Sequence, residues 1–185
     1  KEVAAAACDW LDDAAKSMGA ANTIWLDDSG RLCGANTDGL GFLGNLDQLA
    51  PGWDVSRESA VVLGAGGAAR AVVWALLSRK FTRVHIVNRT FEKAKAIADM
   101  FGSGTIAHEW DNLGTVLEEA DLLVNTTSLG MAGKAPLEID LSPLPKTAIV
   151  TDAVYAPLET DLLRSAKARG NQTVDGLGML LHQAV

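Results

Sequence analysis

The stretch AVVLGAGGAARAVVWALLS, residues 60–78, decides the fold that this sequence predicts. It opens with a short apolar run rich in β-branched residues, Ala60 to Leu63, and passes through a turn of small residues. From Ala68 it continues as a helical pattern of Ala, Val and Leu. A buried strand that leads through glycines into a helix is the first half of a βαβ unit. The stretch therefore predicts an α/β fold.

The same alternation of apolar strands and helical segments continues to about Val174. Further strands are expected at Val84–Val87, Asp121–Val124 and Ala148–Thr151, and further helices at Phe91–Phe101 and Glu159–Arg169. Strands that read as continuous apolar runs are buried on both faces, as in parallel sheets covered by crossover helices. We expect a doubly wound parallel sheet.

The first fifty residues follow a different pattern. They predict a helix over Glu2–Met18, a hairpin of strands Asn22–Leu26 and Arg31–Ala35 around the turn Asp27–Gly30, and a helix over Asp38–Leu49. A hairpin and two helices cannot close a core alone. We therefore expect an incomplete N-terminal α/β lobe beside the doubly wound domain.

The overall composition excludes several classes of protein. The net charge of −7 over 185 residues argues against a nucleic-acid binder, which needs cations for phosphate. No apolar stretch approaches the length of about 18 residues that spans a bilayer. Cys8 and Cys33 do not lie at metal-ligand spacing and are expected to be reduced thiols. We therefore expect a cytoplasmic protein without a bound metal.

The glycine turn is the strongest functional signal. Gly64-x-Gly66-x-x-Ala69 follows a strand and opens a helix, which is the setting of a dinucleotide-binding turn. Gly64 permits a tight turn, Gly66 lets the backbone approach a pyrophosphate, and the helix start supplies N–H groups to it. The turn, Gly64 to Ala68, is thus a predicted cofactor site in a Rossmann-like domain. The alternative is a tight turn without a ligand.

The end of the second strand indicates which dinucleotide is bound. A site for NAD usually has Asp or Glu there, roughly 20 residues after the glycines, to hold the ribose 2′-hydroxyl. This sequence has Asn88-Arg89-Thr90 instead, with Lys93 one turn further on. A guanidinium can pair with a 2′-phosphate that a carboxylate would repel. We therefore expect NADP.

Other polar residues are less specific. Thr126, Thr127 and Ser128 follow a strand end where cofactors bind, but they would serve nearly as well to cap their own loop. Asp38 and Asp175 are each explained as helix caps, and the lone His182 is best explained by packing.

Five motifs in order change this reading. They are Gly19-Ala20-Ala21-Asn22-Thr23-Ile24, Gly34-Ala35-Asn36-Thr37-Asp38-Gly39, Gly64-Ala65-Gly66-Gly67-Ala68, Asn88-Arg89-Thr90 and Asp175-Gly176-Leu177-Gly178-Met179-Leu180. The series resembles the shikimate dehydrogenase family, and the resemblance runs through nearly the whole chain. It implies NADP-dependent reduction of 3-dehydroshikimate to shikimate in the biosynthesis of aromatic amino acids.

The resemblance also implies roles for single residues. Lys1 would be the catalytic lysine and Asp38 its acidic partner. The residues implied for substrate binding are Asn22, Asp38, Tyr155 and Gln183, with Val154, Gly176 and Met179 near the nicotinamide. We expect three segments, namely residues 1–50 as the remnant of the substrate lobe, 51–175 as the NADP domain, and 176–185 as a helix that returns to the substrate lobe.

The resemblance further implies that about the first quarter of the enzyme and its C-terminal tail lie outside this chain. The alternatives are an NAD-dependent quinate/shikimate dehydrogenase and a truncated, non-catalytic dinucleotide-binding module. Glutamyl-tRNA reductase shares the glycine turn and Asn-Arg-Thr, but the acidic charge argues against a tRNA surface. We expect a small-molecule substrate and neither a nucleic acid nor a membrane as partner, and the sequence leaves a homodimer open.

Overall fold

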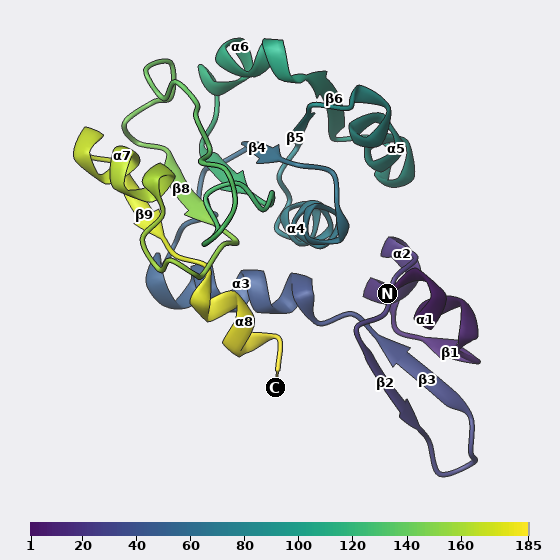
Figure 1. The fold of residues 1–185 in the computed structure, drawn as a ribbon. Helices are drawn as coiled ribbons and strands as arrows, with labels where there is room; N and C mark the ends of the chain where they lie inside the picture. Colours follow the sequence, from purple (N-terminus) through teal and green to yellow (C-terminus); the bar gives the residue numbers. More distant parts are fainter. Residues whose placement is uncertain (185) are drawn as a thin grey trace.

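The computed structural model describes residues 1–184, and Val185, the last residue of the expected segment 176–185, lies outside them. Within residues 1–184 the strands form two sheets (Figure 1). The larger has the order β6-β5-β4-β7-β8-β9, and every neighbouring pair is parallel. Its strands are β4 (Ser59–Leu63), β5 (Arg83–Asn88), β6 (Thr105–Glu109), β7 (Leu122–Asn125), β8 (Ile149–Asp152) and β9 (Gln172–Val174). This order confirms the doubly wound sheet.

Helices cover both faces of this sheet. The helices of this part are α3 (Asp38–Leu49), α4 (Gly67–Ser78), α5 (Phe91–Phe101), the 3-10 helix η1 (Trp110–Asn112), α6 (Leu113–Leu117) and α7 (Asp161–Arg169). Residues of β4 alternate between two cores. Val62 packs with α3, α4 and α5, whereas Val61 and Leu63 pack with α6 and α7. The apolar runs of the sequence are therefore strands buried on both faces.

The edges of the sheet were not predicted. Strands β6 and β9 lie at the two edges, and helix α6 joins β6 to β7. Strand β6 holds polar and half-exposed residues such as His108, so it lacks the apolar run that marks a central strand. Helix α7 begins at Asp161, two residues later than expected, because Thr160 caps it through a hydrogen bond from Leu163 N.

The predicted helix over Glu2–Met18 is wrong. The structure divides it into α1 (Glu2–Ala7), β1 (Trp10–Leu11) and α2 (Asp13–Met18). Trp10 and Leu11 pair in parallel with a strand of the hairpin, and Asp12 starts α2 by accepting a hydrogen bond from Ala15 N at 2.6 Å. A side-chain cap and a tertiary strand pairing thus override the local helical pattern.

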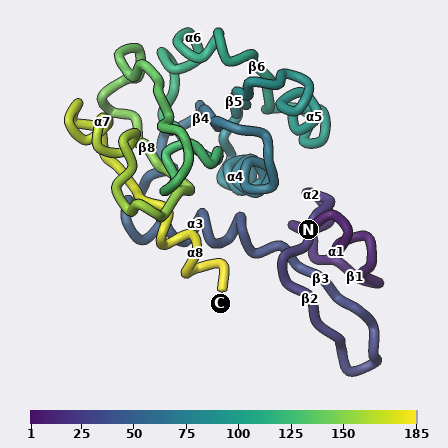
Figure 2. The backbone as a smooth tube through the Cα atoms, viewed as in Figure 1, coloured from purple at the N-terminus to yellow at the C-terminus, as the bar shows by residue number. Residues whose placement is uncertain are grey.

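The hairpin is confirmed and belongs to the smaller sheet. Strands β2 (Thr23–Leu26) and β3 (Leu32–Ala35) are antiparallel, and the sheet order is β1-β3-β2. Figure 2 shows the hairpin extending away from the larger sheet. All four residues of β2 are exposed. This small mixed sheet is the N-terminal α/β lobe expected from the sequence.

Helix α8 (Leu177–His182) returns to the side of α3, as Figure 1 shows. The two helices approach closely because α3 has glycines at the contact. A Cβ on Gly41 would lie 2.6 Å from the carbonyl oxygen of Met179. Gly176 is the N-cap of α8, so Asp175 is not at the expected cap position, although it accepts a hydrogen bond from the first helical N–H, that of Leu177, at 3.0 Å. Among residues 1–184, none of the helices combines the length and apolar character that crossing a membrane requires.

Candidate functional site

The glycine turn has the backbone that its sequence predicts. Gly64 has φ +104°, and a Cβ there would lie 2.9 Å from the hydroxyl oxygen of Thr126. A Cβ on Gly66 or Gly67 would meet no heavy atom within 4 Å. Gly66 is the N-cap of α4 and offers no side-chain cap. The turn therefore leaves open space above helix N–H groups, which is the arrangement that binds a pyrophosphate.

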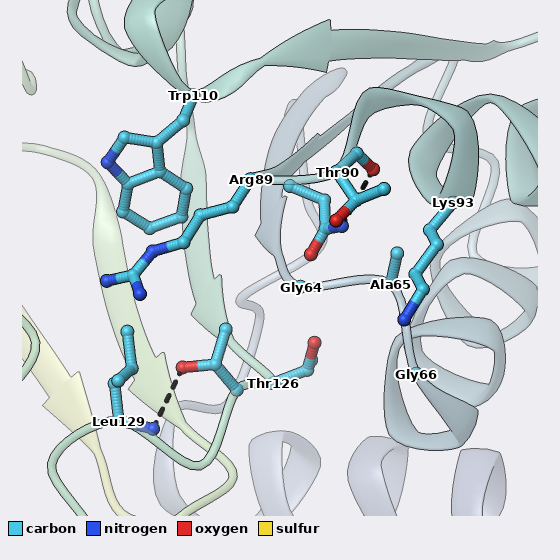
Figure 3. Close-up of a pocket in the computed structure, with 11 residues that line it drawn as sticks. Gly64, Ala65, Gly66, Arg89, Thr90, Lys93, Trp110, Thr126 and Leu129 are labelled. Atoms are coloured by element: carbon cyan, nitrogen blue, oxygen red, sulfur yellow. Dashed lines mark hydrogen bonds between the residues drawn. The ribbon is translucent and has the colours of Figure 1, made fainter. Parts of the chain in front are cut away.

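A cavity of about 360 Å³ lies over this turn (Figure 3). Nine of the expected cofactor residues line it: Gly64, Ala65, Gly66, Asn88, Arg89, Thr90, Lys93, Thr126 and Thr127. In Figure 3, the Arg89 side chain extends beside Trp110, whereas Lys93 points towards the glycine turn. The lining holds two cations and no carboxylate. It therefore suits a ligand that carries phosphate.

Other expected cofactor residues lie elsewhere. Ser128 is exposed and Val154 is buried, and neither lines this cavity or the second one described below. Thr126 and Thr127 line the cavity, but their hydroxyls already donate to Leu63 O at 2.6 Å and to Asn125 Oδ1 at 2.7 Å. The Thr127 hydroxyl also accepts a hydrogen bond from Leu129 N at 3.1 Å, which is the cap of its own loop that the sequence offered as an alternative, whereas Thr126 bonds to the end of β4.

A buried network of hydrogen bonds supports the loops at the carboxyl ends of strands β7 and β8. Asp152 Oδ1 accepts hydrogen bonds from Asn125 Nδ2 and Val154 N, both at 2.9 Å, and Oδ2 accepts one from Thr160 at 2.7 Å. Burial raises the pKa of the Asp152 carboxyl. Asn125 in turn accepts from Thr127 N at 3.0 Å. Asp152 therefore connects the loop that lines the cofactor cavity to the loop that carries Tyr155.

A second, smaller cavity of about 180 Å³ is lined by four of the five residues expected at the substrate, and the fifth, Asn22, lies behind it on Asp38. Its lining is Lys1, Asp38, Ala68, Ala153, Tyr155, Gly176, Met179, Leu180 and Gln183. These residues come from the chain start, α3, α4, the loop after β8 and α8. Ala68 follows Gly66 by two residues, so the glycine turn borders both cavities.

Asp38 is the centre of this second site. Its carboxylate is buried, with Lys1 Nζ paired to Oδ2 and Asn22 Nδ2 donating to Oδ1 at 2.8 Å. Asn22 Oδ1 accepts from Thr37 N at 3.0 Å. The interpretation of Asp38 as a helix cap is wrong, because Thr37 is the N-cap and the Asp38 side chain turns to Lys1 and Asn22.

The end of α8 closes the same site. Thr37 donates to the carbonyl of Gln183 at 2.7 Å. His182 packs against Gly44 and shares a hydrogen bond with Gln48 at 2.8 Å, in agreement with the expected packing role. These contacts fix the chain around Gln183 beside Asp38.

Four residues that line the two cavities and one residue that supports their loops were not predicted as site residues. They are Trp110, Leu129, Asp152, Ala153 and Leu180. Trp110 follows the edge strand β6, so a correct prediction of β6 would have placed it beside the end of β5. Asp152 follows the predicted strand at Ala148–Thr151, and its position at a strand end was the available signal.

The chain is similar in sequence to a known family of dehydrogenases. The family model described as "Shikimate / quinate 5-dehydrogenase" matches residues 47–132. The shikimate dehydrogenase (NADP(+)) of Nitrobacter hamburgensis is 57% identical over 174 residues, which cover 94% of this chain and 60% of that protein. The shikimate dehydrogenase (NADP(+)) of Azorhizobium caulinodans is 56% identical, over 100% of this chain and 66% of that protein.

A solved structure of a related dehydrogenase has a similar fold. The structure of quinate dehydrogenase from Corynebacterium glutamicum in complex with NAD matches with a TM-score of 0.92 and 33% sequence identity. The match covers 100% of this chain and 67% of that one. The chain thus spans 60% and 66% of the two curated relatives and 67% of this neighbour.

Proposed function

Because the chain belongs to the shikimate/quinate dehydrogenase family, we propose that the protein that carries it interconverts 3-dehydroshikimate and shikimate with NADP. The direction that we propose in the cell is reduction, as a step of aromatic amino-acid biosynthesis. The observation that carries the proposal is the buried Asp38 paired with Lys1 beside the glycine turn. Both curated relatives described above are named for this activity.

The proposed cofactor residues lie at the carboxyl ends of the strands of the larger sheet. The helix start at Gly66 would face the pyrophosphate, and Arg89 and Lys93 would face a 2′-phosphate. The end of β5 carries no acidic residue to repel that phosphate. When bound, NADPH would supply the hydride for the carbonyl carbon.

The proposed role of Lys1 is to donate one proton to the substrate oxygen during reduction. Its ammonium lies against Asp38 at the cavity, where the substrate carbonyl would sit. As charge develops on that oxygen, a nearby ammonium stabilises it and can donate a proton. Asp38 would orient Lys1 and accept a hydrogen bond from a substrate hydroxyl. Asn22 holds Asp38 in place from the other oxygen.

The remaining cavity residues would fix the substrate ring. Tyr155, in the loop after β8, and Gln183, at the end of α8, both line the cavity and carry groups that hydrogen-bond hydroxyls. Gly176 and Met179 would lie near the nicotinamide, because they occupy the same lining.

A second candidate is an NAD-dependent quinate dehydrogenase. It is favoured by the neighbour from Corynebacterium glutamicum, which was solved with NAD. Arg89 argues against it, because the guanidinium has its best partner in a 2′-phosphate.

We further propose that the chain divides into residues 1–50, 51–175 and 176–185. We also propose that the protein is cytoplasmic and acts without a nucleic-acid partner.

The test is an assay of the protein that carries this chain, with shikimate or quinate and with NADP or NAD. We expect the pair of shikimate and NADP to be used most efficiently. Lys1→Ala and Asp38→Asn should each lower turnover by about 10²–10⁴-fold, the usual contribution of a positioned acid or base.

Lys167→Ala, which removes an exposed lysine of α7, is the control and should leave turnover unchanged. Turnover of Lys1→Ala near that of the parent would overturn the catalytic assignment. Equal efficiency with NADP and NAD would contradict the assignment of Arg89 to the 2′-phosphate.

A further inference from the structure

Trp110 lines the cofactor cavity without an assigned role. It begins η1 directly after β6, and its partly buried indole packs against the core that contains Val87 and Leu113. This anchoring holds the ring at the cavity wall. Figure 3 shows the indole beside the Arg89 side chain.

The contact with Trp110 is the main one that fixes the position of the Arg89 guanidinium. Arg89 is exposed, and among the polar contacts of residues 1–184 its guanidinium has no ion pair and no hydrogen bond. Its contact with an aromatic ring is with Trp110, whose ring centroid lies 5.6 Å from the guanidinium carbon. A cation within about 6 Å of an indole is attracted by the negative face of the ring.

The geometry favours a supporting role for the ring. An unsupported arginine samples many rotamers, and fixing it on a ligand costs conformational entropy. The indole occupies one side of the guanidinium, while the N–H groups of the guanidinium stay free for a phosphate. A ring that is itself held by the core would therefore lower the entropy that Arg89 loses when a phosphate binds.

We propose that Trp110 is a positioning residue that holds Arg89 for the 2′-phosphate and thereby sets the preference for NADP over NAD. The proposal deepens the proposed function and rests on it. Trp110 would act through Arg89 and would not touch the phosphate. Its removal should therefore affect the phosphorylated cofactor alone.

The experiment measures dissociation constants for NADP and NAD by calorimetry in the protein that carries this chain. Trp110→Leu should weaken NADP binding about two- to fivefold, the range expected for an exposed cation–π contact. NAD binding should stay unchanged. Trp110→Phe keeps a ring and should restore most of the NADP affinity. Trp25→Leu, which removes a tryptophan of the hairpin, should change neither constant.

A double-mutant cycle separates positioning from general damage. In the background of Arg89→Ala, Trp110→Leu should have no further effect on NADP binding. Should Trp110→Leu unfold, Trp110→Met keeps the apolar core contact and takes its place. An equal loss for NADP and NAD, or an undiminished effect without Arg89, would overturn the proposal.

Two outcomes separate the role of Trp110 from the proposed preference for NADP. A parent protein that binds NADP more tightly than NAD, combined with a silent Trp110→Leu, overturns only the role of Trp110. A parent that binds both cofactors equally overturns the proposed NADP specificity and the role of Trp110 together.

Discussion

Asp152 ends strand β8 with a carboxylate that the fold buries almost completely, at 1% exposure. Three donors reach it, from Asn125, Val154 and Thr160. A buried charge of this kind is costly unless its hydrogen bonds are all made. Here the same bonds also connect the loops of the two cavities, so the residue has a structural role at the functional edge of the sheet.

Substitution of Asp152 should depend strongly on the replacement. Asp152→Ala leaves buried donors unpaired and should lower the free energy of unfolding by about 2–4 kcal/mol. Asp152→Asn keeps an acceptor for Asn125 and Val154 and can donate to Thr160, so the loss should be about 1 kcal/mol or less. Urea unfolding at pH 7 measures both. Equal stability of parent and Asp152→Ala would contradict the network.

At the scale of elements, the outer pair of strands carries a pH-sensitive contact. Nδ1 of His85 on β5 and Nε2 of His108 on β6 share a hydrogen bond at 2.9 Å. Burial lowers the pKa of both imidazoles, and for His85 the neighbouring His108 and Arg83 lower it further while Glu119 raises it. The neutral pair therefore belongs to the folded state.

This pair should make the protein less stable in mild acid. Below the unfolded pKa near 6.5, the unfolded state binds more protons than the folded state, so stability falls as the pH drops towards the folded pKa. The double substitution of His85 and His108 by Gln should flatten this slope between pH 7 and pH 5. Unfolding curves at each pH measure it, and those at pH 8 give the cost of the substitutions without protonation. An unchanged slope would refute the assignment.

At the scale of the whole molecule, the N-terminal lobe meets the larger domain through a small core. Met18 is fully buried at the end of α2, where it packs with Ala14, Ala20 and Ala71 of α4. A hydrogen bond and ion pair from Arg70 to Glu2, at 2.5 Å, adds a polar link. These contacts hold α1, and with it Lys1, beside α4.

Met18→Ala should loosen this junction more than it harms the cofactor site. The lost burial and the cavity should destabilise the lobe by about 2–5 kcal/mol. We expect lower turnover, because Lys1 is no longer held against Asp38, with NADP affinity close to that of the parent. Met100→Ala, at a site 44% exposed on α5, is the control. Equal losses of turnover and NADP affinity would contradict this prediction, because they would show that the junction at Met18 also supports the cofactor site.

The local sequence predicted much of the fold and part of the site. Helices α3 and α5 begin and end where expected, and the central strands β4, β5, β7 and β8 differ from their predicted bounds by one residue at most at each end. Prediction failed for β6 and β9, because an edge strand is half exposed and loses the apolar pattern. It also failed for the region around Trp10, where pairing with β3 overrides helical propensity.

The sequence by itself determined the glycine turn and the cation at the end of β5, because each is a pattern within a single βαβ unit. Only the tertiary structure decided which distant residues meet. Lys1 reaches Asp38 across 37 positions, and Trp110 lies beside Arg89 because β6 pairs with β5. The reason is physical: local periodicity fixes which face of an element is buried, whereas the order of strands and the packing of lobes fix which faces touch.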